Sequence, residues 1–103
     1  MSDKELLELA AKAAGIYDEC EWFECKEENG LLVWCFVQGS REWNPLTDDG
    51  DALRLAVKLG LGIRFYLDGV GAGEEYEMNN EDPYAATRRA IVRAAAEIGR
   101  GME

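Results

Sequence analysis

Residues 43–60 read WNPLTDDGDALRLAVKLG, which joins an aromatic turn and an acidic run to a short amphipathic helix. Four apolar side chains of the helical part repeat at helical spacing: Ala52, Leu55, Ala56 and Leu59. Aspartate or threonine at a helix start accepts backbone N–H bonds, and further acidic residues complement the helix dipole. Glycine commonly ends a helix. The segment therefore predicts a helix that is capped by Asp48 or Thr47 and ended by Gly60.

The N-terminal residues predict another helix. Ser2 with Glu5 three residues later is the signature of a capping box. The apolar side chains that follow have helical periodicity: Leu6, Leu9, Ala10 and Ala13. We therefore expect a first helix over residues 3–14, ended by Gly15.

Two strand-like runs, residues 20–28 and 31–37, flank Asn29-Gly30. Asn-Gly is a strong hairpin signal because both turn positions are expected to take positive φ. The first run mixes charged and apolar residues, whereas residues 31–37 have no polar side chain on either alternating face. A strand of that kind is typically covered on both sides. We therefore expect a helical layer on each face of the sheet.

The C-terminal half predicts two more strands and a third helix. Residues 61–67 alternate and would direct a set of apolar side chains inward: Leu61, Ile63, Phe65 and Leu67. Residues 69–73, GVGAG, are interpreted as a hairpin loop, with a mobile ligand lid as the alternative, and residues 74–78 as a charged edge strand. Asp82-Pro83 predicts a helix start. The inward side chains of that helix would be Tyr84, Thr87, Ile91, Ala94, Ala95 and Ile98.

These elements predict one α+β domain over residues 1–103. The element order is α-β-β-α-β-β-α. Its expected architecture is a mostly antiparallel four-stranded sheet sandwiched by helices on both faces.

The same residues also carry a family resemblance. The WNPL turn that runs into Asp49-Gly50-Asp51-Ala52 resembles the phage "ABA sandwich" domain, and residues 86–99 resemble the closing helix of that family. The likeness spans roughly residues 43–100, with a weaker likeness in the first helix. It implies a bacteriophage or prophage origin and a sandwich fold, and it implies no particular activity.

The net charge of the chain limits the classes of partner that it can bind. The chain has 11 basic and 21 acidic residues, a net charge of −10, and all ten net negative charges lie in residues 1–80. A field of this sign repels nucleic-acid phosphate and anionic lipid and attracts basic surfaces. Residues 1–103 hold no apolar run of about 20 residues and begin without a signal-peptide pattern. We therefore expect an intracellular protein that contacts neither nucleic acid nor membrane, and the phage resemblance implies that it acts in the host cytoplasm.

Catalytic and metal sites are not expected. The sequence has no histidine, so it lacks the usual general base and activator of a nucleophile. Three cysteines do not complete a four-ligand zinc site, and aligning Gly50 with the EF-hand glycine puts Ala56 at the closing glutamate position. We therefore predict a non-enzymatic protein without metal or cofactor.

Two groups of residues are candidates for ligand binding. Trp43 and Asn44 are interpreted either as a loop anchor or, with Arg41, as a rim where a planar ligand stacks. The arginines of the third helix form either a solvated face that pairs with acidic strands or an anion pocket. That pocket would combine Arg88, Arg89 and Arg93 with Arg64, with Arg41 or with a second subunit.

The acidic residues are candidates for partner binding. Asp48 and Asp49 are interpreted as helix-capping residues, with partner contact or cation binding as alternatives. The acidic strands either provide solubility and protect an edge, or imitate phosphate and dock on a basic protein. Their candidate contact residues are Glu24, Glu27, Glu75 and Glu77.

The leading hypothesis is a non-enzymatic phage accessory protein that blocks a host factor, such as an antiviral defence component, through an acidic surface and the loop at Trp43 and Asn44. The alternative is a homo-oligomer that sequesters a nucleotide-like ligand between Trp43, Asn44 and the third-helix arginines. An enzyme that uses only carboxylates, such as Asp48 and Asp51, is a third hypothesis. The sequence leaves the oligomeric state open.

Overall fold

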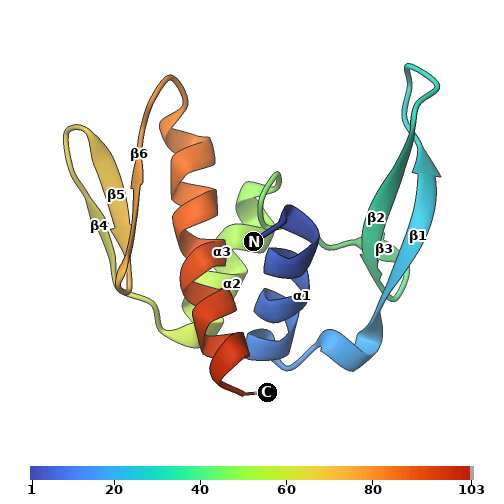
Figure 1. The fold of residues 1–103 in the computed structure, drawn as a ribbon, viewed down its shortest axis with the longest axis horizontal. Coiled ribbons are helices and arrows are strands. Elements are labelled where there is room, and N and C mark those ends of the chain that lie inside the picture. Colours follow the sequence, from blue (N-terminus) through green and yellow to red (C-terminus); the bar gives the residue numbers. More distant parts are fainter. Residues whose placement is uncertain (103) are drawn as a thin grey trace.

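The computed structural model describes residues 1–102 and places three helices between two antiparallel sheets (Figure 1). The helices are α1 (Asp3–Ala14), α2 (Asp49–Leu59) and α3 (Pro83–Gly101). A 3-10 turn, Tyr17–Glu19, leads into the first sheet, which consists of β1 (Cys20–Lys26), β2 (Leu32–Gln38) and β3 (Arg41–Glu42). The second sheet consists of β4 (Ile63–Phe65), β5 (Gly69–Ala72) and β6 (Glu75–Met78).

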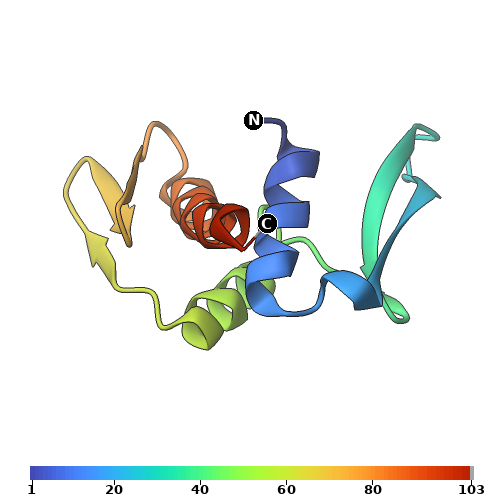
Figure 2. The same ribbon diagram turned by 60° about the horizontal axis from the view of Figure 1, so that its bottom comes forward.

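The α+β class is confirmed, but the expected arrangement of layers is wrong. The strands form two three-stranded sheets and not one four-stranded sheet, and the helices lie between the sheets (Figure 2). The physical reason lies in α3, whose buried residues cover more than one face: Ala86, Ala90, Ile91, Val92, Ala94, Ala95, Ala96 and Gly99. One side of α3 packs on α1 and α2 and another packs on β5 and β6, so α3 separates the sheets.

The three helices begin as the sequence predicts, and α1 and α2 also end at the predicted glycines, Gly15 and Gly60. Ser2 and Glu5 form the reciprocal capping box of α1, and Asp48 caps α2 by accepting the Asp51 N–H. Asp82 caps α3 and Pro83 is its first residue. Among residues 1–102, no helix has both the length and the apolar character that a membrane crossing requires.

The β1–β2 hairpin projects from the helices as an arm, defined here as residues 20–38 (Figure 1). The hairpin is confirmed, although only Gly30 of its turn has a positive φ, of 86°. The expectation that residues 31–37 are covered on both sides is wrong. Leu32 is 63% exposed and Trp34 is 61% exposed, because only the base of the arm packs on the core.

The glycine-rich segment is a strand and not the expected loop. Residues 69–72 form β5, the buried central strand of the second sheet. Glycine is required because side chains from both neighbouring strands lie over it. A Cβ at Gly69 would lie 2.3 Å from the Tyr76 hydroxyl oxygen, and a Cβ at Gly71 would lie 3.1 Å from Nη2 of Arg64. The expected inward direction of Phe65 is also wrong, since that ring is 73% exposed.

The helices α1 and α3 approach closely through small residues. Ala10 and Ala11 of α1 and Ala95 and Ala96 of α3 are buried, and these two helices share the most extensive contact between any two elements in residues 1–102. Gly99 faces the backbone of α1, where an added Cβ would lie 1.9 Å from the Leu9 carbonyl oxygen.

We expect Gly99→Ala to lower the free energy of unfolding by about 1–3 kcal/mol, because the methyl group forces α1 away from α3. Thermal or urea denaturation measures this change. Gly101→Ala is the matched control in the same helix, since no heavy atom lies within 4 Å of its Cβ position. A Gly99→Ala protein as stable as the Gly101→Ala protein would contradict this account of the helix contact.

Candidate functional site

The Asp51 carboxylate is the centre of the conspicuous 43–60 segment. The residue is only 2% exposed. Its Oδ2 accepts the Asn44 backbone N–H at 2.9 Å, and its Oδ1 accepts Nη2 donors of Arg41 at 2.5 Å and Arg54 at 2.8 Å. The carboxylate therefore connects β3, the loop that follows it and α2.

These donors set the pKa of Asp51. Burial is the largest single influence and by itself would raise the pKa. The Asn44 N–H and the Arg54 and Arg41 guanidinium groups act in the opposite direction. Together they hold the pKa below the ordinary value of 3.8. The carboxylate is therefore ionised and fully partnered, which suits a structural role better than proton transfer.

Trp43 and Asn44 anchor the loop. The Trp43 indole is 6% exposed and packs edge-on against Phe36, with ring centroids 6.2 Å apart. The Asn44 Oδ1 accepts the Leu46 N–H at 3.0 Å, and its carbonyl accepts the Asp48 N–H at 2.9 Å. Of the two interpretations of this loop, the structure therefore agrees with the loop anchor. The Trp43 indole is too deeply buried for a planar ligand to stack on its face.

The arginines of α3, interpreted either as a paired face or as part of an anion pocket, contact different elements. Arg88 donates to the Leu46 carbonyl at 2.9 Å and pairs with Asp49 at 2.6 Å, which ties α3 to the start of α2. Arg89 instead pairs with Asp3 of α1 at 3.0 Å. Arg88 and Arg89 therefore pair with acidic residues of different elements, which corresponds to the paired face of the two interpretations and not to the anion pocket.

The remaining candidate arginines are also held apart. Arg93 pairs with Glu75 at 2.9 Å and with Glu77, so it joins α3 to β6. Arg64 donates to the Tyr66 hydroxyl at 3.1 Å and to the Gly73 carbonyl at 3.0 Å within the second sheet. Arg41 belongs to the Asp51 cluster. Each guanidinium thus connects elements of the fold.

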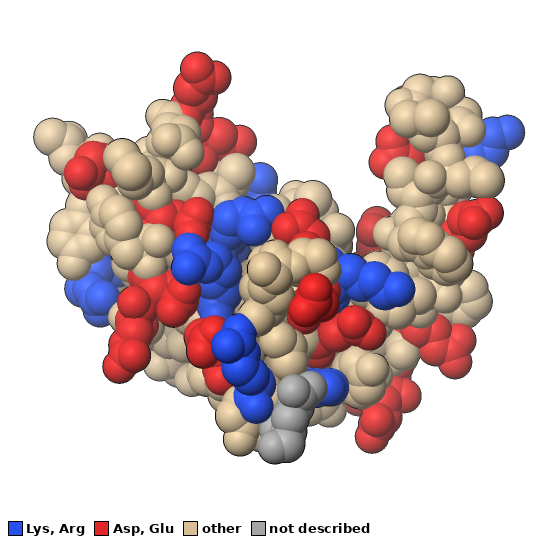
Figure 3. All heavy atoms as spheres, in the orientation of Figure 1, with Lys and Arg blue, Asp and Glu red and all other residues tan. Residues whose placement is uncertain are grey.

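The acidic candidates divide into partnered and unpartnered groups. Glu75 and Glu77 are only partly exposed, and both pair with Arg93, whose single positive charge offsets one of their two negative charges. In contrast, Glu24 and Glu27 on the arm are exposed, and no ion pair involves them in the part of the chain that the structure describes. Figure 3 shows acidic side chains on the arm apart from the basic side chains at the centre of that face. The arm therefore carries free acidic side chains, whereas Glu75 and Glu77 of β6 are paired.

The arm has two apolar faces that the sequence analysis did not separate. The register pairs Trp22 with Phe36 and Glu24 with Trp34, so both tryptophans lie on the face that packs on α1. The opposite face carries Phe23, Cys25, Val33, Cys35 and Val37. Pairing the residues of the two strands outward from the Asn29-Gly30 turn, and assigning alternate pairs to opposite faces, would have predicted both faces from the sequence.

The arm thiols do not form a reactive centre. The Cys35 S–H donates to the Cys25 sulfur, and this bond, burial and the nearby Glu42 charge raise the pKa of Cys35 to about 12, so the thiol stays protonated at neutral pH. No group of three or more Cys, Asp or Glu side chains among residues 1–102 is arranged to hold a metal ion.

An apolar groove between α2, β4 and α3 is a second feature that the sequence analysis missed. Its volume is about 670 Å³, and its walls include Leu53, Phe65, Tyr84 and Ile91. Arg88 lies at this groove, but Asp49 and the Leu46 carbonyl already occupy two of its donors. The groove was missed because Phe65 was expected to point into the core.

Comparison with known proteins gives no relative, since no protein-family model, curated protein or solved structure matches the chain. No activity can therefore be transferred to it. Evidence on function comes instead from the geometry of the arm and of the Asp51 cluster.

We expect Asp51→Asn to lower the free energy of unfolding by about 1–3 kcal/mol, because two charged hydrogen bonds to arginines are lost. Urea denaturation measures the change. The matched control is Asp49→Asn, where an exposed carboxylate loses one pair with Arg88 and the expected loss is under about 1 kcal/mol. Equal losses of unfolding free energy in the two variants would show that the buried Asp51 carboxylate stabilises the fold no more than the exposed Asp49 carboxylate does.

The stability should also depend on pH through Asp51. Because the pKa of its carboxyl is lowered in the folded state, its contribution is complete above the ordinary pKa of 3.8 and is lost as the pH falls through the lowered value. The wild-type protein should therefore lose stability on acidification below pH 3.8 more steeply than Asp51→Asn. Parallel pH profiles of the two proteins would refute this linkage.

Proposed function

We propose that the protein is a non-enzymatic bacteriophage accessory protein that binds a basic host protein and blocks it. An antiviral defence component is the class of target that fits such a role best. The observation that carries the proposal is the arm, which projects from the helices with unpaired carboxylates and exposed apolar side chains. The phage origin rests on the resemblance of residues 43–60 and 86–99 to the phage ABA sandwich family.

Charge supports the arm as the contact element. Residues 20–38 contain four glutamates, all exposed, and one lysine: Glu21, Glu24, Glu27, Glu28 and Lys26. The field of such a surface steers a basic partner toward it and repels nucleic acid. Elsewhere many acidic side chains are occupied within the fold, as Glu75 and Glu77 are by Arg93.

Exposed apolar side chains provide the other half of a binding surface. Phe23, Leu32 and Trp34 are all exposed on the arm, close to the glutamates. Aromatic anchors contribute most of the binding energy in many protein interfaces, while charges on the rim set the association rate and the choice of partner. Both kinds of residue occur together on this one hairpin.

The placement of the carboxylates favours a binding role over catalysis. Asp48 accepts the Asp51 N–H, and Asp51 is neutralised by two arginines, so neither is a poised acid or base. The alternative of a sequestered nucleotide-like ligand has no comparable support. Trp43 is buried, and the helix-three arginines pair with three different elements.

Reversing charges on the arm should abolish capture of the partner. We expect Glu24→Lys with Glu27→Lys to retain at least roughly tenfold less host protein from a bacterial host lysate than the wild type, because the attraction becomes repulsion. Immobilised protein at physiological salt, with quantification of each retained species, measures this. Retention by the wild type should also fall as salt is raised.

The matched control is Glu74→Lys with Glu81→Lys, which changes the net charge equally at exposed positions off the arm. This control should retain the same species as the wild type. Equal retention by the arm and control variants, or no species that depends on the arm charges, would overturn the proposal.

A further inference from the structure

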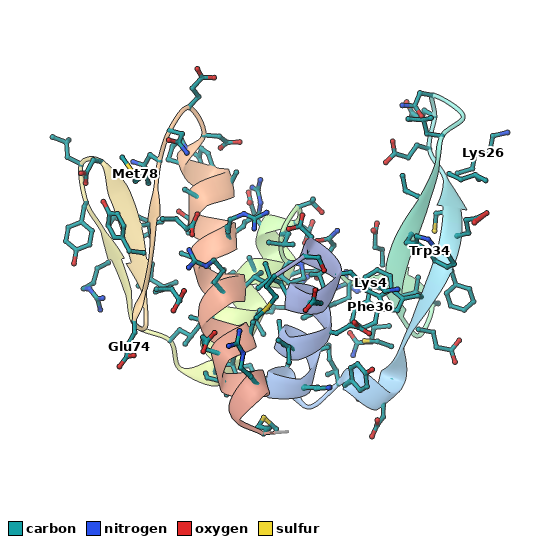
Figure 4. All side chains as sticks on the ribbon, viewed as in Figure 1. Lys4, Lys26, Trp34, Phe36, Glu74 and Met78 are labelled. Carbon is teal, nitrogen blue, oxygen red and sulfur yellow. The ribbon has the colours of Figure 1, made fainter. Side chains whose placement is uncertain are left out.

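A lysine of α1 reaches across to the arm and meets two tryptophan rings. The Lys4 ammonium nitrogen lies 5.2 Å from the Trp22 ring centroid and 5.8 Å from the Trp34 ring centroid. Figure 4 shows Lys4 extending from α1 toward the arm beside Trp34, and Figure 3 shows that the space above this contact is open between the arm and the helices. Both distances are within the range of cation–π attraction.

The two rings differ in how firmly they are held. Trp22 stacks on Phe36 with ring centroids 4.4 Å apart, and its Nε1–H donates to Oε2 of Glu8 at 3.3 Å. Trp34, two residues further along the same face of the arm, is largely exposed. The space between the two rings, where the Lys4 ammonium group lies, is called the notch here. Its Trp22 wall is packed against the core, and its Trp34 wall is open to solvent.

Helix physics alone gives no reason for a lysine at this position. Lys4 lies in the first turn of α1, where a cation opposes the helix dipole. It precedes Glu8 by one turn, in the less favourable order for an ion pair along a helix, and no ion pair involves Lys4 among residues 1–102. The aromatic faces are its partners in the fold.

We propose that the notch formed by Trp22 and Trp34 is a binding site for a lysine-type ammonium group of a partner, and that Lys4 is its internal occupant. The chain's own lysine demonstrates the chemistry that the notch accepts. Glu24, directly opposite Trp34 in the hairpin register, adds a carboxylate beside the open wall. A partner's ammonium that displaces Lys4 meets the same two rings and this charge.

This inference rests on the proposed function for the identity of the partner, because a basic protein supplies the ammonium group. It adds the position of the ammonium contact, which is the face of the arm toward α1 that carries Trp22 and Trp34. Lys4 then acts as a competitor, so the apparent affinity for an external ammonium is reduced by the fraction of molecules in which Lys4 occupies the notch.

The test uses tetramethylammonium as the probe and the three tryptophan indole N–H signals in a proton–nitrogen NMR spectrum as the readout. Titration should shift the Trp22 and Trp34 signals, while the signal of buried Trp43 stays in place as an internal reference. Sodium chloride at equal ionic strength should produce neither shift. In Lys4→Gln the apparent affinity should rise roughly fivefold, as expected for removal of one exposed cation–π competitor.

Two variants make the test specific. Lys12→Gln removes a lysine that lies 4.9 Å from the Tyr17 ring centroid on the same helix, and it should leave the affinity for the probe unchanged. Lys4→Gln with Trp34→Leu should lose the response of Trp22. If tetramethylammonium shifts Trp22 and Trp34 no more than sodium does in Lys4→Gln, or if Lys12→Gln raises the affinity as much as Lys4→Gln, the site does not exist as proposed.

The outcomes separate this inference from the proposed function. Host-protein capture that depends on Glu24 and Glu27, together with no response to tetramethylammonium, would overturn the notch and leave the arm as the contact element. A specific tetramethylammonium response without any captured protein would support the notch as an ammonium site and overturn the basic host partner.

Discussion

The buried Asp51 carboxylate connects the first sheet to the helices. It bonds to Arg41 at the base of the arm, to the Asn44 amide in the loop and to Arg54 on α2. Since burial alone would disfavour its charge, the ionised form depends on all three donors. The same carboxylate thereby fixes how the chain leaves the first sheet and enters α2. The direction in which the arm projects depends on this connection.

Helix α3 distributes the remaining charge. Its arginines neutralise acidic residues of α2, α1 and β6, one element each for Arg88, Arg89 and Arg93. Among residues 1–102, no arginine of α3 pairs with Glu24 or Glu27, because the arm extends away from α3. The concentration of unpaired negative charge on the arm is therefore a consequence of the fold and not only of composition.

The sequence predicted what depends on neighbouring residues and failed where distant packing decides. The capping box at Ser2, the Asp48 cap and the turn at Gly30 follow from local chemistry, and the structure confirms them. The apolar run of residues 31–37 carries no information about whether a helix will cover it. Likewise, the sequence GVGAG is compatible with a loop or with a strand, and the difference depends on Tyr76 and Arg64, which cover it from the neighbouring strands. The sequence left two interpretations of the arginines open for the same reason, since the pairing of Arg88, Arg89 and Arg93 is a long-range property.

The departure of residues 31–37 from the expected burial has physical meaning. Exposing Trp34 and Leu32 forgoes burial that would stabilise the fold by roughly 1.5–3 kcal/mol for a large apolar side chain. Natural sequences that break a local rule in this way commonly do so at functional positions. The arm is held at its base by the Trp22–Phe36 stack and by the Asp51 cluster, while its outer part has no such support. A partner can therefore engage the outer part without disturbing the contact between α1 and α3 on which the helices depend.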